Sequence, residues 1–340
     1  MNKRALRADI LLLLTAGIWG FGFVAQRSGM EYIGPFAFNG IRFILGSISL
    51  LPLIFIRRRG SVTGIALPRH LFLPSLAAGS CLFIAVIFQQ FGIIFTTAGN
   101  AGFITGLYVV LTPVFGIFLG RKTGLTTWIG SILTLAGLYF ISAAGNTGSI
   151  NPGDIIIVIS AFFWAAHVLL IDYLMRVKIA PNIGDKELSL DPVELSAGQF
   201  AVCGFFSLIG AFLAEPYIGA AIERVDPSLL SAGLFQWQPF PALVASLKAG
   251  TMRVSAEAVI PILYGGLCSV GIAYTLQVVA QRDAPPAHAT IILCFEGCFA
   301  ALGGMLLLSE KAGIWTLLGF AFMLVGMLAT QWDVIAGRRH

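Results

Sequence analysis

The chain has 340 residues, of which 57% are hydrophobic and 11% are charged, and its net charge is +5. A soluble domain carries about 25% charged residues, so this composition excludes a water-soluble globular protein. The mean hydropathy of +0.89 indicates that lipid covers most of the surface, and we expect the lipid bilayer as a partner.

Ten apolar segments follow one another along the chain. A membrane span needs roughly 20 mostly apolar residues to cross about 30 Å of hydrocarbon. The segments that meet this requirement are 9–27, 35–56, 70–93, 98–120, 124–143, 152–174, 192–214, 257–279, 286–308 and 312–332. A helix satisfies its own backbone hydrogen bonds in lipid, and the alternation typical of barrel strands is absent. We therefore predict an all-α integral membrane protein with ten transmembrane helices.

Lysine and arginine are unevenly distributed between the two sides of these spans. With the N-terminus placed inside, 15 of the 21 basic residues lie in the cytoplasm and 5 lie outside, while Arg42 lies within the second span. Because basic residues concentrate in cytoplasmic loops, we predict that both termini are cytoplasmic, in a bacterial inner membrane. This bias explains the net charge, so we expect no nucleic-acid partner. The basic residues before the first segment also fit a signal peptide, but we interpret that segment as a retained span.

Two short patterns occur once in each half of the chain. In the first pattern, Lys122, Gly124, Gly130 and Gly137 recur at equal spacing as Lys311, Gly313, Gly319 and Gly326. In the second pattern, Asp9 and Trp19 recur at equal spacing as Asp154 and Trp164. Five spans per copy give the second copy the opposite orientation, and such inverted repeats are typical of transporters that bind substrate between the copies. We predict one repeat at 1–147 and a second at 148–340. We also predict an external insertion at about 215–256. It is either an interfacial element at the level of the lipid headgroups or a tether without function.

Six motifs are spread over nearly the whole chain. They are Ile18-Trp-Gly20, Gly40-Ile-Arg-Phe43, the stretch 96–108, Gly271-Ile-Ala-Tyr-Thr-Leu-Gln277, the stretch 287–296 and Leu306-Leu-Leu-Ser-Glu310. Together with the inversion, they resemble the drug/metabolite transporter superfamily with two EamA-type repeats. The chain departs from the family at Gly297, where proline is frequent, and in the long insertion. The resemblance implies a central cavity lined largely by spans 1, 3, 4, 6, 8 and 9. It also implies small organic substrates, often amino acids or related metabolites, and often export.

Ionisable groups at membrane depth are costly and are functional hypotheses by default. Glu296 lies at least ten residues from either end of its apolar segment. We predict that it couples transport to protons, with a bracing role between helices as the alternative. For His167 in the sixth span, substrate binding and a structural hydrogen bond both stay open. We expect Arg42 to pair with Glu296 or a backbone carbonyl, and Asp172 and Arg27, near span ends, to be solvated.

Neutral polar and aromatic residues within the spans are further candidates. Aromatic walls with a few polar groups suit small-molecule pockets. Trp19, Phe23 and Gln26 follow an i, i+4, i+7 stripe, and Tyr274 and Gln277 share a helix face. The predicted substrate-binding residues are Trp19, Gln90, Tyr108, Trp164, His167, Tyr274 and Gln277. Helix packing with interhelical hydrogen bonds is the alternative for each.

The leading functional interpretation is a secondary transporter that moves a small organic metabolite by alternating access. A membrane enzyme would need a nucleophile with a base, a metal cluster or paired acids, and we find neither His-Glu-x-x-His nor a facing Asp pair. No phosphate-binding loop of the Gly-x-x-x-x-Gly-Lys-Ser/Thr type occurs. We therefore predict no catalytic residue, no metal site and no cofactor. A membrane enzyme or a non-transporting membrane partner stays an alternative, and a homodimer is left open.

Overall fold

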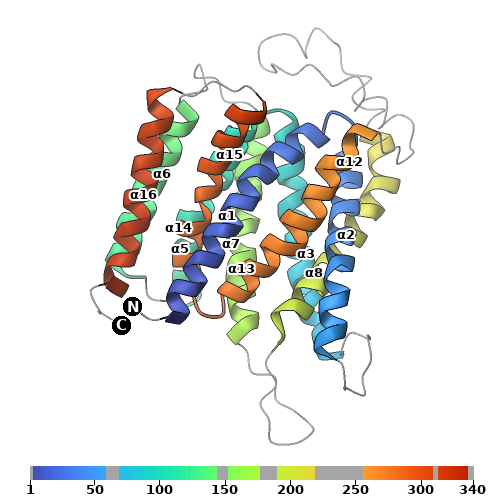
Figure 1. The fold of residues 1–340 in the computed structure, drawn as a ribbon, viewed down its shortest axis with the longest axis horizontal. Coiled ribbons are helices and arrows are strands. Elements are labelled where there is room, and N and C mark those ends of the chain that lie inside the picture. Colours follow the sequence, from blue (N-terminus) through green and yellow to red (C-terminus); the bar gives the residue numbers. More distant parts are fainter. Residues whose placement is uncertain are drawn as a thin grey trace, which may run out of the picture.

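The computed structural model describes residues 3–58, 69–121, 123–143, 152–176, 190–218, 256–308 and 313–335. All regular secondary structure in these ranges is helical (Figure 1). The helices are α1 (Lys3–Gly29), α2 (Pro35–Arg57), α3 (Arg69–Ile94), α4 (Ala98–Thr105), α5 (Tyr108–Phe118), α6 (Leu125–Ala143), α7 (Pro152–Arg176), α8 (Pro192–Leu213), α12 (Ala256–Leu263), the π-helix η1 (Tyr264–Tyr274), α13 (Thr275–Ala280), α14 (Pro286–Leu293), α15 (Phe295–Leu307) and α16 (Ile314–Ile335).

The described helices confirm a multi-pass membrane protein. Among them, eight candidate spans are long and apolar enough to cross a bilayer. Five are the single helices α1, α2, α3, α7 and α8, and three are runs of consecutive helices: α4–α5, α12–η1–α13 and α14–α15. The prediction of ten spans exceeds these eight by two, because α6 and α16 contain shorter apolar stretches, Leu125–Gly137 and Leu317–Gly326. Large apolar side chains also face outward, such as Leu73 at 70% and Ile260 at 77% exposure. Lipid is the solvent that such a surface requires.

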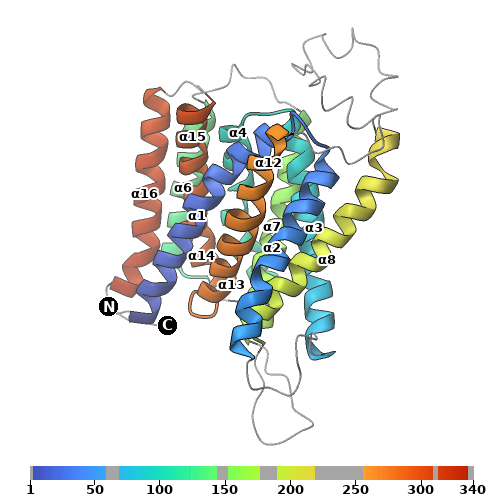
Figure 2. The same ribbon diagram turned by 45° about the vertical axis from the view of Figure 1, so that its right-hand side comes forward.

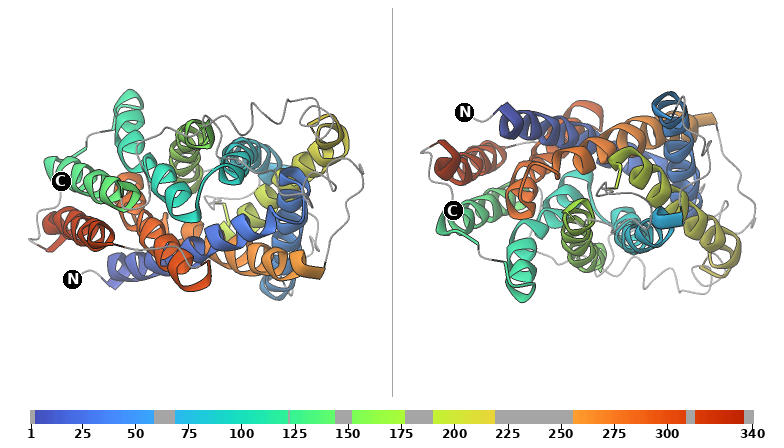
Figure 3. Two further views of the ribbon diagram at one scale, coloured as in Figure 1. Left: turned by 90° about the horizontal axis from the view of Figure 1, so that it is seen from above. Right: turned by 90° about the horizontal axis from the view of Figure 1, so that it is seen from below.

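The helices run side by side along one direction (Figures 1 and 2). The beginning of α1 and the end of α16 lie at the same end of the bundle, which we call the terminal end. Seen from above and below, α6 and α16 form a pair at one side of the molecule, and α2 and α8 lie toward the other (Figure 3). Of the predicted 215–256 insertion, residues 219–255 lie outside the described part of the chain.

Two of the spans are interrupted near their middle. The α4–α5 span breaks at Gly106-Leu107 and the α14–α15 span breaks at Cys294. The two breaks contact each other, since the Cys294 thiol donates a hydrogen bond of 3.3 Å to the carbonyl of Gly106. The backbone of Gly106, Leu107 and Cys294 keeps right-handed helical dihedral angles, and bonds to the third preceding residue replace part of the α-helical pattern. Gly106 and Cys294 are buried, so both interruptions lie inside the bundle.

The π-helix η1 is a third irregular segment, and α1 packs against it. Its backbone carbonyls accept bonds from α1: the Trp19 Nε1–H donates to Ser269 at 3.2 Å and the Thr15 hydroxyl donates to Ala273 at 3.2 Å. Short π-helical turns occur frequently at functional sites. These bonds hold α1 and its tryptophan in one place relative to η1.

Glycines allow the close approach of helices in the core. A Cβ atom on Gly20 of α1 would lie 2.8 Å from the backbone oxygen of Glu296 on α15. A Cβ atom on Gly92 of α3 would lie 2.8 Å from the carbonyl oxygen of Gly153 on α7. Small residues at such crossings are the usual means of packing helices in lipid. The Gly20 contact brings α1 directly beside the α14–α15 break.

Candidate functional site

A cavity of about 30 Å³ lies in the middle of the bundle. Residues from the first and the second half of the chain line it together. They are Trp19, Phe23, Gln26, Arg42, Gln89, Thr105, Tyr108, Trp164, Val168, Ser269, Tyr274, Gln277, Leu293 and Glu296. The mixture of aromatic rings with a few polar groups suits a small organic ligand.

Three aromatic residues form one wall of this cavity. The ring centroid of Tyr274 lies 4.5 Å from that of Trp19 and 5.9 Å from that of Trp164. The two tryptophans come from corresponding positions of the sequence repeat, on α1 and α7, and their ring centroids are 6.3 Å apart. Offset and tilted aromatic pairs at these separations are favourable. The three rings therefore pack against one another and line the cavity together.

A tyrosine and a carboxyl group lie at the two helix breaks. The Tyr108 hydroxyl donates a hydrogen bond of 3.0 Å to Oε1 of Glu296. Tyr108 is the first residue of α5 and Glu296 the second of α15, and both side chains are buried. The breaks thus place an ionisable group in the centre of the membrane domain.

Several polar groups of the cavity wall lack partners. Within the described part of the chain, no hydrogen bond is made by Nε1 of Trp164, by Oε1 of Gln26, or by either amide atom of Gln277. Leaving a buried polar group unsatisfied costs about 1–3 kcal/mol. A ligand or water with donors and acceptors of its own would remove this cost. Gln89, in contrast, donates a bond of 3.0 Å to Thr105.

Arg42 of α2 reaches the cavity with a charge. Its side chain is 1% exposed, and its Nε–H donates a bond of 2.9 Å to Oδ1 of Asn39. Its guanidinium carbon lies 5.3 Å from the ring centroid of Phe38 and 5.0 Å from that of Phe43. The expected pairing with Glu296 or with a backbone carbonyl is wrong, because Asn39, three residues earlier on the same helix face, accepts the bond instead.

Two predicted substrate-binding residues lie behind the wall. Gln90 is buried outside the lining, and its side-chain amide lies 3.5 Å from the carbonyl of Gln26. His167 is bonded through Nε2 to Oε1 of Gln199 at 2.9 Å, and its ring meets Trp164 edge-on at 6.0 Å. One residue on a helix turns about 100°, so Gln89 faces the cavity where Gln90 does not.

The expectation that Asp172 is solvated is wrong. Its side chain is fully buried, although it lies one turn from the end of α7. Oδ2 pairs with Arg121 at 2.6 Å and Oδ1 with Arg176 at 2.8 Å. Arg121 comes from the connection between α5 and α6, which covers the carboxyl group. A second and more open hollow of about 420 Å³ lies beside this cluster and includes both arginines in its lining.

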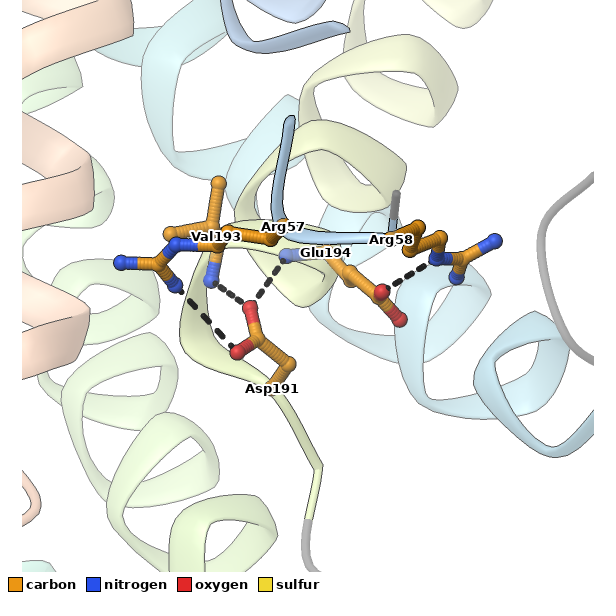
Figure 4. A network of polar contacts seen from close by, with 5 residues as sticks. All are labelled: Arg57, Arg58, Asp191, Val193 and Glu194. Carbon is orange, nitrogen blue, oxygen red and sulfur yellow. Dashed lines mark hydrogen bonds and ion pairs between the residues drawn. The ribbon is translucent and has the colours of Figure 1, made fainter. Parts of the chain in front are cut away.

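Further ion pairs join helices at the terminal end. His288 at the start of α14 bonds to Asp9 of α1 at 2.8 Å. Arg57 and Arg58 at the end of α2 pair with Asp191 and Glu194 at the start of α8, at 3.4 and 2.6 Å (Figure 4). The hydrogen bond that the Arg58 Nε–H donates to Glu194 is the main cause that raises the pKa of Arg58. Asp191 also accepts bonds from the backbone N–H groups of residues 193 and 194, so it caps α8 as well.

Sequence reasoning missed four lining residues: Thr105, Val168, Ser269 and Leu293. Val168 follows Trp164 by four residues, so helical spacing could have found it. Thr105 and Leu293 end α4 and α14, and they reach the cavity because the helices break there. No pattern in the sequence marks those breaks.

A central cavity within helices of spanning length is a feature of membrane proteins that bind small molecules. The chain matches the EamA-like transporter family over residues 6–143 and 239–331, and it belongs to this family.

Relatives of known sequence agree with this assignment. An uncharacterized transporter of Archaeoglobus fulgidus is 33% identical over 51% of this chain. The matched part covers about half of that relative, 52% of its length. A second one from the same organism is 23% identical over 95% of this chain and 97% of its own length. The uncharacterized inner membrane transporter YedA of Escherichia coli is 26% identical over 63% of this chain and 74% of its own length. One crystal structure shares the fold, with a TM-score of 0.69, 15% identity, and coverage of 98% of this chain and 99% of that one.

Proposed function

We propose that this protein is a secondary transporter that carries a small organic metabolite across the cell membrane by alternating access. The observation that carries the proposal is the buried cavity, where polar groups without partners meet an aromatic wall built by both halves of the chain. An assembly partner without transport activity has no need for such a costly buried site. Amino acids and related compounds are the expected substrate class, and export is the expected direction.

The proposed architecture is a pair of inverted five-helix repeats, at 1–147 and 148–340. The pairing of helices supports it: α1 packs on α15 as α7 packs on α5 and α4, and α3 packs on α7 as η1 packs on α1. The two interrupted spans also fall at corresponding places, since Cys294 follows Gly106 by nearly the spacing that separates the glycine patterns. Inverted repeats place equivalent groups on opposite sides of one site, and Trp19 and Trp164 fit that relation.

Glu296 is the proposed proton-coupling group. It is buried beside Tyr108 at the helix breaks, and within the described residues no cation lies within ion-pair distance of it. A carboxyl group that is held by a neutral hydroxyl can exist with or without its proton. Substrate and proton would therefore meet in the same cavity, which is the requirement for coupling their movements.

The proposed substrate contacts are the lining residues of the predicted set: Trp19, Tyr108, Trp164, Tyr274 and Gln277. Gln90 and His167 support them from behind, His167 by fixing the ring of Trp164. Both termini are proposed to be cytoplasmic, so the ion pairs of the terminal end would close the cytoplasmic side.

Uptake into proteoliposomes tests the proposal. Purified protein is reconstituted, and a panel of labelled amino acids and related metabolites is screened with and without an imposed pH gradient. We expect saturable uptake of at least one group of related compounds above protein-free liposomes, and loss of that uptake in Trp164→Ala. Absence of uptake or exchange for the whole panel would contradict a transport function.

A further inference from the structure

The guanidinium of Arg42 is a buried positive charge without a counter-ion. Its side chain is 1% exposed and lines the central cavity. Its only hydrogen bond within the described chain is the one from Nε to Asn39. A guanidinium has five N–H donors, so four donors on the two terminal nitrogens stay unused. Burying an unpaired charge is expensive, and such a group is expected to acquire an anionic partner.

The surroundings of Arg42 leave the cavity as the place for that partner. Phe38 and Phe43 lie against the guanidinium on α2 itself, and Gly265 of η1 approaches its side chain closely. These contacts fix the position of the side chain by packing and by cation–π attraction. None of these contacts carries a negative charge. The guanidinium is therefore held in place while its positive charge stays without a counter-ion.

Glu296, the one carboxyl group of the cavity lining, is engaged elsewhere. Its Oε1 accepts the bond from Tyr108 on the α5 side, and it forms no ion pair with Arg42 among the described residues. The lining therefore has a cationic place on α2 and an acidic place on α15, with the Tyr274 ring packed between Phe43 and the tryptophans. An anionic group entering this cavity is attracted to Arg42 and repelled by an ionised Glu296.

We propose that Arg42 binds a carboxylate group of the transported compound, and that substrates of this protein are carboxylates with a small body that packs on the aromatic wall. The inference rests on the proposed transport function and specifies its substrate. A planar guanidinium binds a carboxylate through two parallel hydrogen bonds, and one cation matches one negative charge. The hollow beside Arg121 and Arg176 would also attract carboxylates. Its two guanidinium groups share the single carboxylate of Asp172, so one positive charge is left over there.

Three probes with the same phenylpropyl body and different end-group charge test the inference on the unmodified protein. They are 3-phenylpropionate, 3-phenylpropanamide and 3-phenylpropylamine, and binding is followed by the fluorescence of the cavity tryptophans in detergent at neutral pH. Because charge-assisted, two-pronged bonds are about twice as strong as neutral ones, we expect the carboxylate to bind at least about tenfold more tightly than the amide and the amine. Equal or tighter binding of the amide or the amine overturns the inference, as does the absence of carboxylate binding.

Variants of Arg42 identify the group that is responsible. In Arg42→Gln we expect the carboxylate to lose about tenfold in affinity while the amide is unchanged, and in Arg42→Lys we expect the preference for carboxylate to persist in weaker form. Arg282→Gln is the matched control, because it removes an exposed guanidinium outside the cavity lining, and it should leave all three affinities unchanged. A folded Arg42→Gln protein that keeps the full preference overturns the inference. If that variant does not fold, the comparison of the probes on wild type and Arg42→Lys decides.

The outcomes separate this inference from the proposed function. Transport of neutral or cationic compounds without any preference for carboxylates would overturn the role of Arg42 and leave the transport function standing. Carboxylate binding that depends on Arg42, without uptake of any compound, would support the binding role and contradict transport.

Discussion

The hydrogen bond between Tyr108 and Glu296 is the feature on which the proposed proton coupling depends. It joins the first turns of α5 and α15, the helices that follow the two interruptions of the spans. In the proposed mechanism, the buried carboxyl group of Glu296 exchanges a proton only when water or substrate reaches it. The proton and the substrate would then move in a coupled way.

At this residue we predict that Glu296→Gln abolishes accumulation driven by a pH gradient while counterflow exchange survives. The amide keeps the shape and the hydrogen bond with Tyr108 but cannot titrate. Both activities are measured in proteoliposomes at equal protein content, with Glu31→Gln as a control that removes a carboxyl group outside the cavity lining. Unchanged accumulation in Glu296→Gln would leave Glu296 with a structural role only.

Glu215 provides a prediction about pH and stability. Its Oε1 accepts bonds of 2.7 and 2.9 Å from the backbone N–H groups of Phe36 and Ala37, so it caps α2 from a segment distant in sequence. Burial raises the pKa of Glu215 to about 7, against the opposing effect of these two donors. The folded protein then binds a proton that the unfolded chain has released, and stability falls as pH rises from about 4.5 to about 7.

We therefore expect Glu215→Gln to reduce this pH dependence, by about 1.4 kcal/mol for each unit of pKa shift that is removed. Thermal unfolding of wild type and variant in one detergent, at pH 5 and pH 8, measures the effect. An identical pH dependence in the two proteins would show that Glu215 does not titrate in this range.

At the scale of elements, ion pairs join the helices at the terminal end. Asp172 binds two arginines from α7 and from the α5–α6 connection while fully buried. Asp191 pairs with Arg57 at 3.4 Å, with the two side chains 40% and 52% exposed. Aspartate–arginine ion pairs therefore occur both around a buried carboxylate and at the surface of the same protein.

This difference predicts unequal costs of mutation. Removing one partner of a buried pair costs about 3–5 kcal/mol, and we expect the lower end for Asp172→Asn, because its arginines are partly exposed. Asp191→Asn should cost less than about 1 kcal/mol, since asparagine also caps a helix well. Thermal unfolding of both variants in the same detergent compares them. Equal losses would contradict the structural role given to Asp172.

The helices themselves are predictable, because each apolar stretch must be long enough to cross the bilayer. Nine of the ten predicted segments agree with the helix boundaries within about three residues, and α1 begins earlier, at Lys3. The breaks at Gly106 and Cys294 have no such signature, since interhelical packing compensates for them. For the same reason the burial of Asp172 depends on Arg121, 51 positions away, and local sequence cannot supply that contact.

The aromatic part of the site follows from helical spacing, but its polar part does not. Trp19, Phe23 and Gln26 share a helix face and all line the cavity. Whether Gln89 or Gln90 faces inward depends on the rotation of α3, which its neighbours set. The open guanidinium of Arg42 likewise depends on Asn39 taking only one of its donors.

For the whole molecule, orientation is the first property to test. We predict that a cysteine at position 60, outside the described residues, reacts with a membrane-impermeant maleimide only from the cytoplasm. A cysteine at position 313 should react only from the outside, and Gly313 has open space around it. The wild-type protein, whose five cysteines lie in the spans, gives the background. The reverse labelling pattern would contradict the proposed orientation.

The central claim is that substrate crosses the membrane through the cavity between the two halves of the chain. Counterflow of the substrates found by screening is measured for Val168→Trp, which fills the cavity, and for Ile260→Trp, which adds the same side chain to an outward-facing position at 77% exposure. We predict that Val168→Trp lowers counterflow to the level of protein-free liposomes while Ile260→Trp transports as wild type does. Equal transport by the two folded variants would contradict the account.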